Sequence, residues 1–156
     1  MLKSKSSTFF HNFIEVFGIN PDTSERIIEN AIAVKNGFEK LQNSSTSITP
    51  HSTYSLSIAL WDSLCDKIIN SNLPVSVHYA ESLPEFEYLM NGTGPLMERY
   101  RLLNIPFDAP FGLTPFKVVT DNINHNKDVL LIHNTFASVE ELVELNRIYR
   151  KATFVT

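Results

Sequence analysis

Short apolar runs rich in β-branched residues alternate with helical patterns along most of this chain. The clearest run is Val75–His78, and similar runs lie near Ile48 and Leu131. Between them, apolar residues recur at helical spacing, and turn-forming residues separate the two kinds of pattern. Strands that alternate with helices are typical of parallel βα units. We therefore expect an α/β fold, with candidate strands near Phe9, Ile48, Val77, Leu131 and Phe154.

Start signals mark several of the expected helices. Ser82 to Glu85 and Ser138 to Glu141 both have the spacing of a capping box, in which a serine and a glutamate each satisfy a backbone N–H group of the first turn. Asn20-Pro21-Asp22 supplies a cap and an early proline for a helix with one buried stripe. That stripe is formed by Ile27, Ile28, Ala31, Val34, Phe38 and Leu41, and further helical segments are expected at 56–68, from Pro95 and after Thr114.

Composition limits the classes of function. The chain has 156 residues, 43% of them hydrophobic and 19% charged, which is ordinary for one globular domain spanning residues 1–156. Its net charge is −4 with scattered basic residues, which argues against a nucleic-acid partner or an anionic membrane surface. No segment approaches the ~20 apolar residues of a membrane span. These features favour a small-molecule substrate.

The single cysteine, Cys65, lies in an apolar helical pattern with Trp61 and Leu64. Free cysteines in such patterns are usually buried and behave as small hydrophobic residues, so we do not expect a nucleophile or a disulfide. A single cysteine also suits a reducing compartment, and a cytoplasmic location is predicted.

Histidines follow three of the candidate strands. His51, His78 and His133 stand at or just beyond strand ends, and Glu81 follows His78 by three positions. The carboxyl ends of parallel strands meet at one edge of a sheet, so these side chains can surround one metal ion or substrate. A single histidine here is more often a hydrogen-bonded residue at a strand end, but three together favour a site. A metal ion held there lowers the pKa of its water from about 15.7 to roughly 7, and a nearby carboxylate can transfer the proton.

Two further histidines stay outside this assignment. His125 lies in a polar loop, and His11 lies inside the first candidate strand. In the irregular segment 104–127, Phe107, Phe111 and Phe116 are expected either to line a pocket or to pack the loop against the core.

With these residues in view, the chain resembles the metal-dependent amidohydrolase superfamily, in the branch of cytosine, guanine and aminofutalosine deaminases and triazine chlorohydrolases. The similar segments are Thr49–Ser55, Val77–Ser82, Leu130–Asn134 and Asn91–Pro95. The resemblance implies a hydrolase of non-peptide carbon–nitrogen bonds, such as a deaminase. Its implied roles are metal ligand for His78, proton shuttle for Glu81, catalytic partner of the attacking water for His133, and substrate contact for His51.

The same resemblance implies a partial TIM (β/α)8 barrel of about strands 3 to 7, a zinc or iron ion, and a nitrogen heterocycle as substrate. The sequence contains no pair of histidines separated by one residue, which is the branch's first-strand motif, so the ion is expected to be incompletely liganded by this chain.

Two alternatives stay open. The chain could instead be a catalytically incomplete remnant that acts as a binding or assembly module, in which case homo-oligomers are expected because a partial barrel leaves open sheet edges. A flavodoxin-like α/β protein is less favoured, because no Gly-rich phosphate loop follows any candidate strand.

Overall fold

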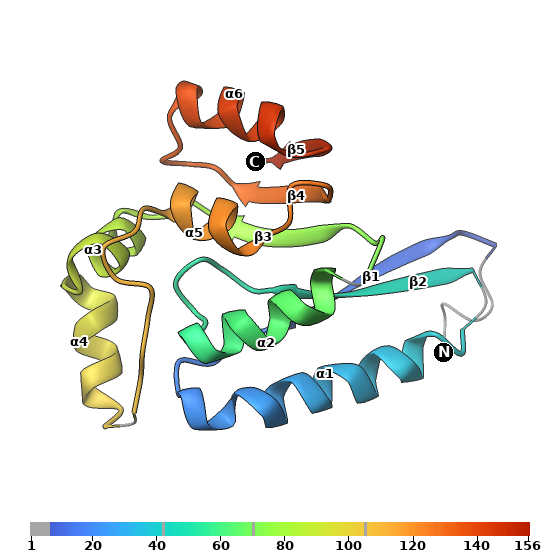
Figure 1. The fold of residues 1–156 in the computed structure, drawn as a ribbon, viewed down its shortest axis with the longest axis horizontal. Helices are drawn as coiled ribbons and strands as arrows, with labels where there is room; N and C mark the ends of the chain where they lie inside the picture. Colours follow the sequence, from blue (N-terminus) through green and yellow to red (C-terminus); the bar gives the residue numbers. More distant parts are fainter. Residues whose placement is uncertain (1–6, 42, 70, 105) are drawn as a thin grey trace.

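Strands and helices alternate along the chain, as the sequence predicts (Figure 1). The computed structural model describes residues 7–41, 43–69, 71–104 and 106–156, so residues 1–6 of the predicted domain lie outside the described residues. The strands are β1 (Phe10–Val16), β2 (Ser44–Pro50), β3 (Val75–Tyr79), β4 (Asp128–His133) and β5 (Lys151–Val155). The helices are η2 (Pro21–Thr23, a 3-10 turn), α1 (Ser24–Phe38), α2 (Ile58–Ile69), α3 (Leu83–Asn91), α4 (Gly94–Leu102), α5 (Pro115–Asn122) and α6 (Val139–Ile148).

Every strand pairing is parallel and follows chain order. One ladder joins β1 to β2, and a second joins β3 to β4 and β4 to β5. A single bridge between Ser52 and His78 joins the two ladders, and His78 N donates to His51 O at 2.9 Å. The hydroxyl of Thr49 extends this connection, because its oxygen accepts from Ser76 N at 2.8 Å. The carboxyl ends of successive strands therefore lie next to one another.

The helices α1, α2 and α6 each pack against a strand that they connect. α1 packs against β1 and β2, α2 packs against β2 and α1, and α6 packs against β5. α3 and α4 stand together at one end of the molecule (Figure 1). No helix in the described ranges is both long and apolar enough to cross a membrane.

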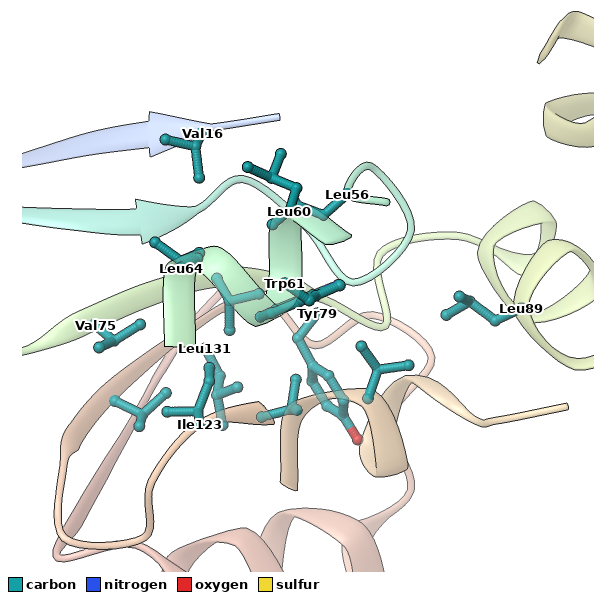
Figure 2. Packing of buried hydrophobic residues seen from close by; sticks show 14 of the residues in the cluster. Val16, Leu56, Leu60, Trp61, Leu64, Val75, Tyr79, Leu89, Ile123 and Leu131 are labelled. Carbon is teal, nitrogen blue, oxygen red and sulfur yellow. The ribbon is translucent and has the colours of Figure 1, made fainter. Parts of the chain in front are cut away.

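The core packs the strands against α2 and extends to α3, α5 and α6 (Figure 2). Strand β3 is buried along most of its length, as parallel strands covered on both faces usually are. Helix α2 contributes Leu60, Trp61 and Leu64, and Leu56, which was expected to begin the helix, lies just before it but is fully buried. The largest fully buried side chains labelled in Figure 2 include Trp61, Leu64, Tyr79 and Leu131.

Shortening a side chain in this core should lower the free energy of unfolding. Leu64 is 0% exposed, so Leu64→Ala is expected to lower the free energy of unfolding by about 2–5 kcal/mol, through lost apolar burial and the cavity left behind. Urea denaturation followed by circular dichroism measures this loss. Ile58 on the same helix is 44% exposed, and Ile58→Ala should cost well under half as much. Equal losses for the two variants would contradict the packing of α2 described above.

Two local predictions are wrong. Val34, expected in the buried stripe of α1, is 48% exposed, whereas Ile28 and Ala31 of the same stripe are buried where α1 packs against β1, β2 and α2. The expected capping box at Ser82 and Glu85 does not form, since Ser82 makes no side-chain cap and the Glu85 carboxylate is used elsewhere. The capping box at Ser138 and Glu141 is confirmed.

The aromatic residues of segment 106–116 pack against helices. Phe111 meets Tyr88 of α3 edge to face with ring centroids 5.3 Å apart, and Phe107 lies 6.4 Å from Tyr100 of α4. Phe116, in α5, is partly buried against the core. These contacts favour the packing interpretation of the loop over the pocket interpretation.

Candidate active site at the strand ends

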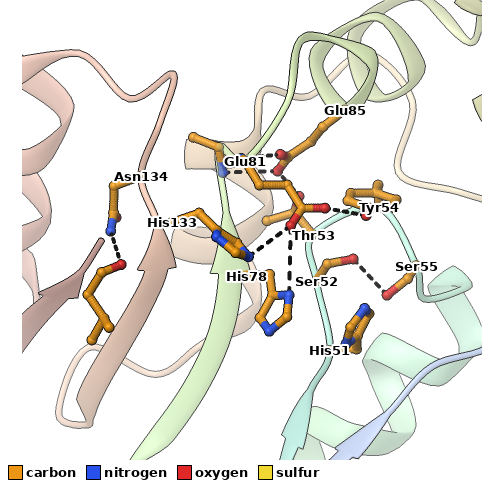
Figure 3. Close-up of polar contacts among 12 residues, drawn as sticks. His51, Ser52, Thr53, Tyr54, Ser55, His78, Glu81, Glu85, His133 and Asn134 are labelled. Carbon is orange, nitrogen blue, oxygen red and sulfur yellow. Dashed lines mark hydrogen bonds and ion pairs between the residues drawn. The ribbon is translucent and has the colours of Figure 1, made fainter.

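Four polar side chains meet at the carboxyl ends of the first four strands. Glu15 lies near the end of β1, His51 directly follows β2, His78 is the penultimate residue of β3, and His133 ends β4. Each position follows from the parallel pairing, since Tyr79 is in register with His133 and Ser52 with His78. The three predicted histidines, His51, His78 and His133, therefore come together (Figure 3).

The imidazole of His78 is at the centre of this group. Its ring centroid lies 4.6 Å from that of His51 and 5.0 Å from that of His133. Its two nitrogens face different carboxylates: Nε2 is 3.5 Å from Glu15 Oε1, and Nδ1 is 3.7 Å from Glu81 Oε2. His78 is thus in reach of groups contributed by the neighbouring strand ends on both sides.

Glu81 lies over the strand ends and has two other partners. Its Oε1 accepts a hydrogen bond from the Tyr54 hydroxyl, and its Oε2 is 3.2 Å from His133 Nε2. Figure 3 shows its carboxylate between Tyr54 on one side and the two histidines on the other. The carboxylate is therefore held at a defined place beside His78 and His133.

On the other side of His78, Glu15 fixes His51. The Nδ1 of His51 is 2.9 Å from Glu15 Oε2, which is hydrogen-bonding distance. When Nδ1 carries the proton and donates it, Nε2 of the neutral ring is left as an acceptor. The same carboxylate faces His78, so Glu15 connects two of the predicted site residues.

The backbone at these strand ends adopts an uncommon conformation. Ala80, His133 and Asn134 have φ values of 48°, 79° and 57°, in the left-handed region that residues with a side chain seldom adopt. Hydrogen bonds hold this geometry, since Asn134 Nδ2 donates to Leu131 O at 2.8 Å and to Val155 O at 3.2 Å. Such strained residues concentrate at functional sites.

The surroundings shift the pKa of two site groups. Burial, followed by the charge of His51, lowers the pKa of His78, which favours a neutral ring with a free lone pair. Burial and the hydrogen bond to Glu81 raise the pKa of Tyr54, so its hydroxyl stays protonated and continues to donate. The first shift suits His78 to metal binding, and the second preserves the hydrogen bond from Tyr54 to Glu81 at neutral pH.

Within the described residues, two groups of side chains have ligand atoms close enough for one metal ion. Glu15, His51 and His78 form the first, and His78, Glu81 and His133 form the second; in each group the ligand atoms lie within 4.8 Å of one another. Two imidazoles and one carboxylate suit zinc and also divalent iron. The donor set fits a divalent ion, and His78 belongs to both groups.

The remaining histidines lie elsewhere, as expected. His11 is near the amino end of β1, and its Nε2 is 2.8 Å from the Ser47 hydroxyl. His125 sits in the loop before β4, with Nε2 3.1 Å from Thr120 O. Neither reaches the strand-end group.

Cys65 has the environment of a structural thiol. Its Sγ donates to Asn122 O at 2.9 Å, and burial, with smaller effects from Asp62 and Asp66, raises its pKa to about 11. Because the thiolate is the reactive form, we expect iodoacetamide at pH 8 to label the folded chain roughly 100-fold more slowly than the urea-unfolded chain. Mass spectrometry follows the labelling. Equal labelling rates for the folded and the unfolded chain would show that the Cys65 thiol is not protected in the fold.

Two residues of the site were not assigned from the sequence. Glu15 occupies the end of β1, the same kind of position that identified His78, so its place at a strand end was the available signal. Tyr54 belongs to the segment that carries the resemblance, but its bond to Glu81 joins residues 27 positions apart, and no local pattern predicts such a contact.

Comparison with known proteins places the fold. No protein-family profile matches the chain, and no curated protein does. Among solved structures, aminofutalosine deaminase from Helicobacter pylori matches with a TM-score of 0.80 at 23% identity, over 98% of this chain and 38% of that one. The same enzyme in complex with methylthio-coformycin matches with a TM-score of 0.78 at 22% identity, over 98% and 37% of the two chains.

An amidohydrolase from Brucella melitensis is also similar, with a TM-score of 0.53 at 20% identity, over 92% of this chain and 30% of that one. The chain thus spans less than two-fifths of the length of the solved chains described here. At these identities the likeness shows the fold. The predicted resemblance to amidohydrolases with a deaminase branch is confirmed at that level, as is the α/β arrangement of parallel strands and helices.

Proposed function

We propose that the chain is the central part of a metal-dependent amidohydrolase that cleaves non-peptide carbon–nitrogen bonds, as a deaminase does. The observation that carries the proposal is the meeting of His51, His78, Glu81 and His133 at adjacent strand ends, within a fold shared with an aminofutalosine deaminase. In this proposal the five strands are about strands 3 to 7 of a TIM barrel, and residues 1–156 belong to one domain.

His78 is the proposed metal ligand of this chain. It takes part in both groups of potential ligands, together with Glu15 and His51 on one side or Glu81 and His133 on the other. A zinc or iron ion bound there would supply a water molecule of lowered pKa for attack on the substrate carbon. Full coordination of such an ion normally uses about three protein ligands and an open position.

Glu81 is the proposed proton carrier. One of its oxygens is occupied by the Tyr54 hydroxyl, and the other faces His78 and His133, so the second oxygen is free to take a proton at the strand ends and return it to a leaving amine. His133, whose Nε2 lies 3.2 Å from this oxygen, is the residue proposed to orient the attacking water or the developing oxyanion.

His51 is the proposed substrate contact. Glu15 holds its Nδ1, and Nε2 is then available to accept from a ring N–H or an amino group. The proposed substrate is a small nitrogen heterocycle with an exocyclic amine, and the complex of the Helicobacter pylori enzyme with methylthio-coformycin supports a small-molecule substrate. The overall reaction consumes one water molecule, replaces the C–NH2 group by a carbonyl and releases ammonia.

The test is ammonia release by the purified chain. Metal-free protein would be supplied with zinc or iron(II) and incubated with amino-substituted purines, pyrimidines and nucleosides. The proposal predicts ammonia release that needs both the metal and an intact Glu81. Stoichiometric metal binding without turnover of any compound in the panel would argue against a deaminase.

A second candidate function is a binding or assembly module. Among the described residues, β1 and β5 each pair on one side only, and Phe9 and Phe17, flanking β1, are 64% and 65% exposed. Open edges with exposed aromatic residues favour association with another chain. Sedimentation velocity over a range of concentrations tests this candidate; a stable oligomer without catalytic turnover would favour it, and a monomer that releases ammonia would exclude it.

A further inference from the structure

Glu85 is a completely buried carboxylate beside the proposed site. It lies in the first turn of α3 and is 0% exposed, yet it has no cationic partner among the contacts described for it. Its Oε1 accepts from the Thr53 hydroxyl and from Ala80 N at 3.2 Å, and its Oε2 accepts from Glu81 N at 2.8 Å (Figure 3). Burial raises the pKa of this carboxyl, and these three hydrogen bonds act in the opposite direction.

A glutamate at the corresponding position of α6 shows what is unusual here. Glu141 follows β4 as Glu85 follows β3, and it closes an ordinary capping box by accepting from Ser138 N at 3.0 Å. Glu85 has the same spacing from Ser82, but Ser82 makes no side-chain cap and the carboxylate reaches past it to the backbone of residues 80 and 81. The carboxylate therefore stabilises the turn that carries Glu81 instead of its own helix end.

That turn needs support. Ala80 has φ +48° and lies between His78 and Glu81, so the left-handed conformation at Ala80 determines the direction in which the chain leaves the end of β3. Glu85 binds the N–H groups of both Ala80 and Glu81. It thereby fixes the backbone from which the Glu81 side chain turns back toward His78.

The third bond joins this turn to the other side of the site. Thr53, which donates to Glu85, is fully buried and directly precedes Tyr54, which donates to the Glu81 carboxylate. One buried carboxylate thus determines the position of the Glu81 backbone and of the loop that binds the Glu81 side chain. The contacts of the Glu81 backbone and, through Thr53 and Tyr54, those of its carboxylate are thus linked to Glu85.

We propose that Glu85 is a positioning residue for Glu81, holding the proton carrier in one orientation toward His78 and His133. The inference rests on the proposed function of Glu81. Glu85 touches no reacting atom in this account and acts only through the Ala80–Glu81 turn and Thr53.

The test is Glu85→Gln in the full chain. The glutamine amide keeps the size of the side chain but replaces one acceptor oxygen with a donor, so the Ala80 or the Glu81 N–H loses its partner. By NMR we expect hydrogen exchange of the amide that loses its partner, Ala80 or Glu81, to rise ~10-fold or more and the Glu81 side chain to change from one rotamer to an average of several. In the metal-loaded chain, kcat should fall ~10–100-fold while KM changes less than ~3-fold.

Glu141→Gln is the matched control, because it changes the equivalent glutamate of α6; exchange and rotamer at Glu81 should stay as in the unchanged chain. Thr53→Val removes the hydroxyl that donates to Glu85 without changing the carboxylate. It should raise hydrogen exchange of the Ala80 and Glu81 amides by about 3-fold. If Glu85→Gln does not fold, Thr53→Val tests whether Glu85 positions Glu81.

The proposal is overturned if the Ala80 and Glu81 amides both keep their protection and Glu81 keeps a single rotamer in Glu85→Gln, or in Thr53→Val where that variant is used. It is also overturned if exchange rises uniformly across the core, because Glu85 would then stabilise the fold without orienting Glu81. Absence of turnover in the unchanged chain counts against the proposed function, whereas the NMR measurements still decide the role of Glu85.

Discussion

Replacing Glu81 by glutamine is expected to lower metal-dependent ammonia release by about 10²–10⁴-fold, the usual contribution of a positioned proton carrier. The amide is close in size to the carboxylate and can still accept from Tyr54, but it cannot take up a proton at the oxygen that faces His133. Steady-state kinetics at saturating metal measures the loss. Metal stoichiometry should stay unchanged, because His78 holds the ion in our proposal and the group that it forms with Glu15 and His51 does not contain Glu81.

Glu140→Gln provides the control for this variant. Glu140 is an exposed carboxylate in the first turn of α6, and its replacement should leave turnover within about 2-fold, as for most surface substitutions. If Glu81→Gln and Glu140→Gln were equally active, Glu81 would not be the proton carrier and the chemistry would need another base.

Replacing His78 by glutamine is expected to weaken metal binding by on the order of 100-fold or more, since a catalytic zinc site relies on about three protein ligands and His78 belongs to both groups of potential ligands. Isothermal titration of zinc into the metal-free chain measures the affinity. His125→Gln is the matched control, because His125 lies in a loop away from the strand ends.

The loss should be specific to His78. Zinc affinity that falls by the same factor in His78→Gln and His125→Gln would indicate adventitious binding to surface histidines. Unfolding in urea distinguishes a lost ligand from a lost fold, since His78 is only half-buried and its replacement should cost little stability.

The elements of this fold could be predicted because their local signals agree. The β-branched run that became β3 and the helical spacing of α2 each match the burial found in the structure. The histidines could be predicted as a group because parallel strands bring their carboxyl ends together, so a position at a strand end already implies a shared location. That argument needs only the order of strands, which the alternation with helices supplies.

Contacts made by long-range packing could not be predicted. Ser82 to Glu85 and Ser138 to Glu141 have the same spacing, yet only the second closes a capping box. The difference arises because the left-handed turn at Ala80 presents two backbone N–H groups to Glu85, and Thr53 arrives from a distant loop. The helical spacing that placed Val34 in a buried stripe likewise carries no information on how far the sheet extends over α1.

A metal titration of the metal-free chain, with bound ion and ammonia release measured on the same sample, tests whether metal held at His78 drives the reaction. We expect release from a deaminase substrate to rise in proportion to bound zinc or iron and to reach its plateau at about one ion per chain, as for a single site that includes His78. Full occupancy without ammonia release, or release that persists in the presence of a chelator, would contradict this expectation.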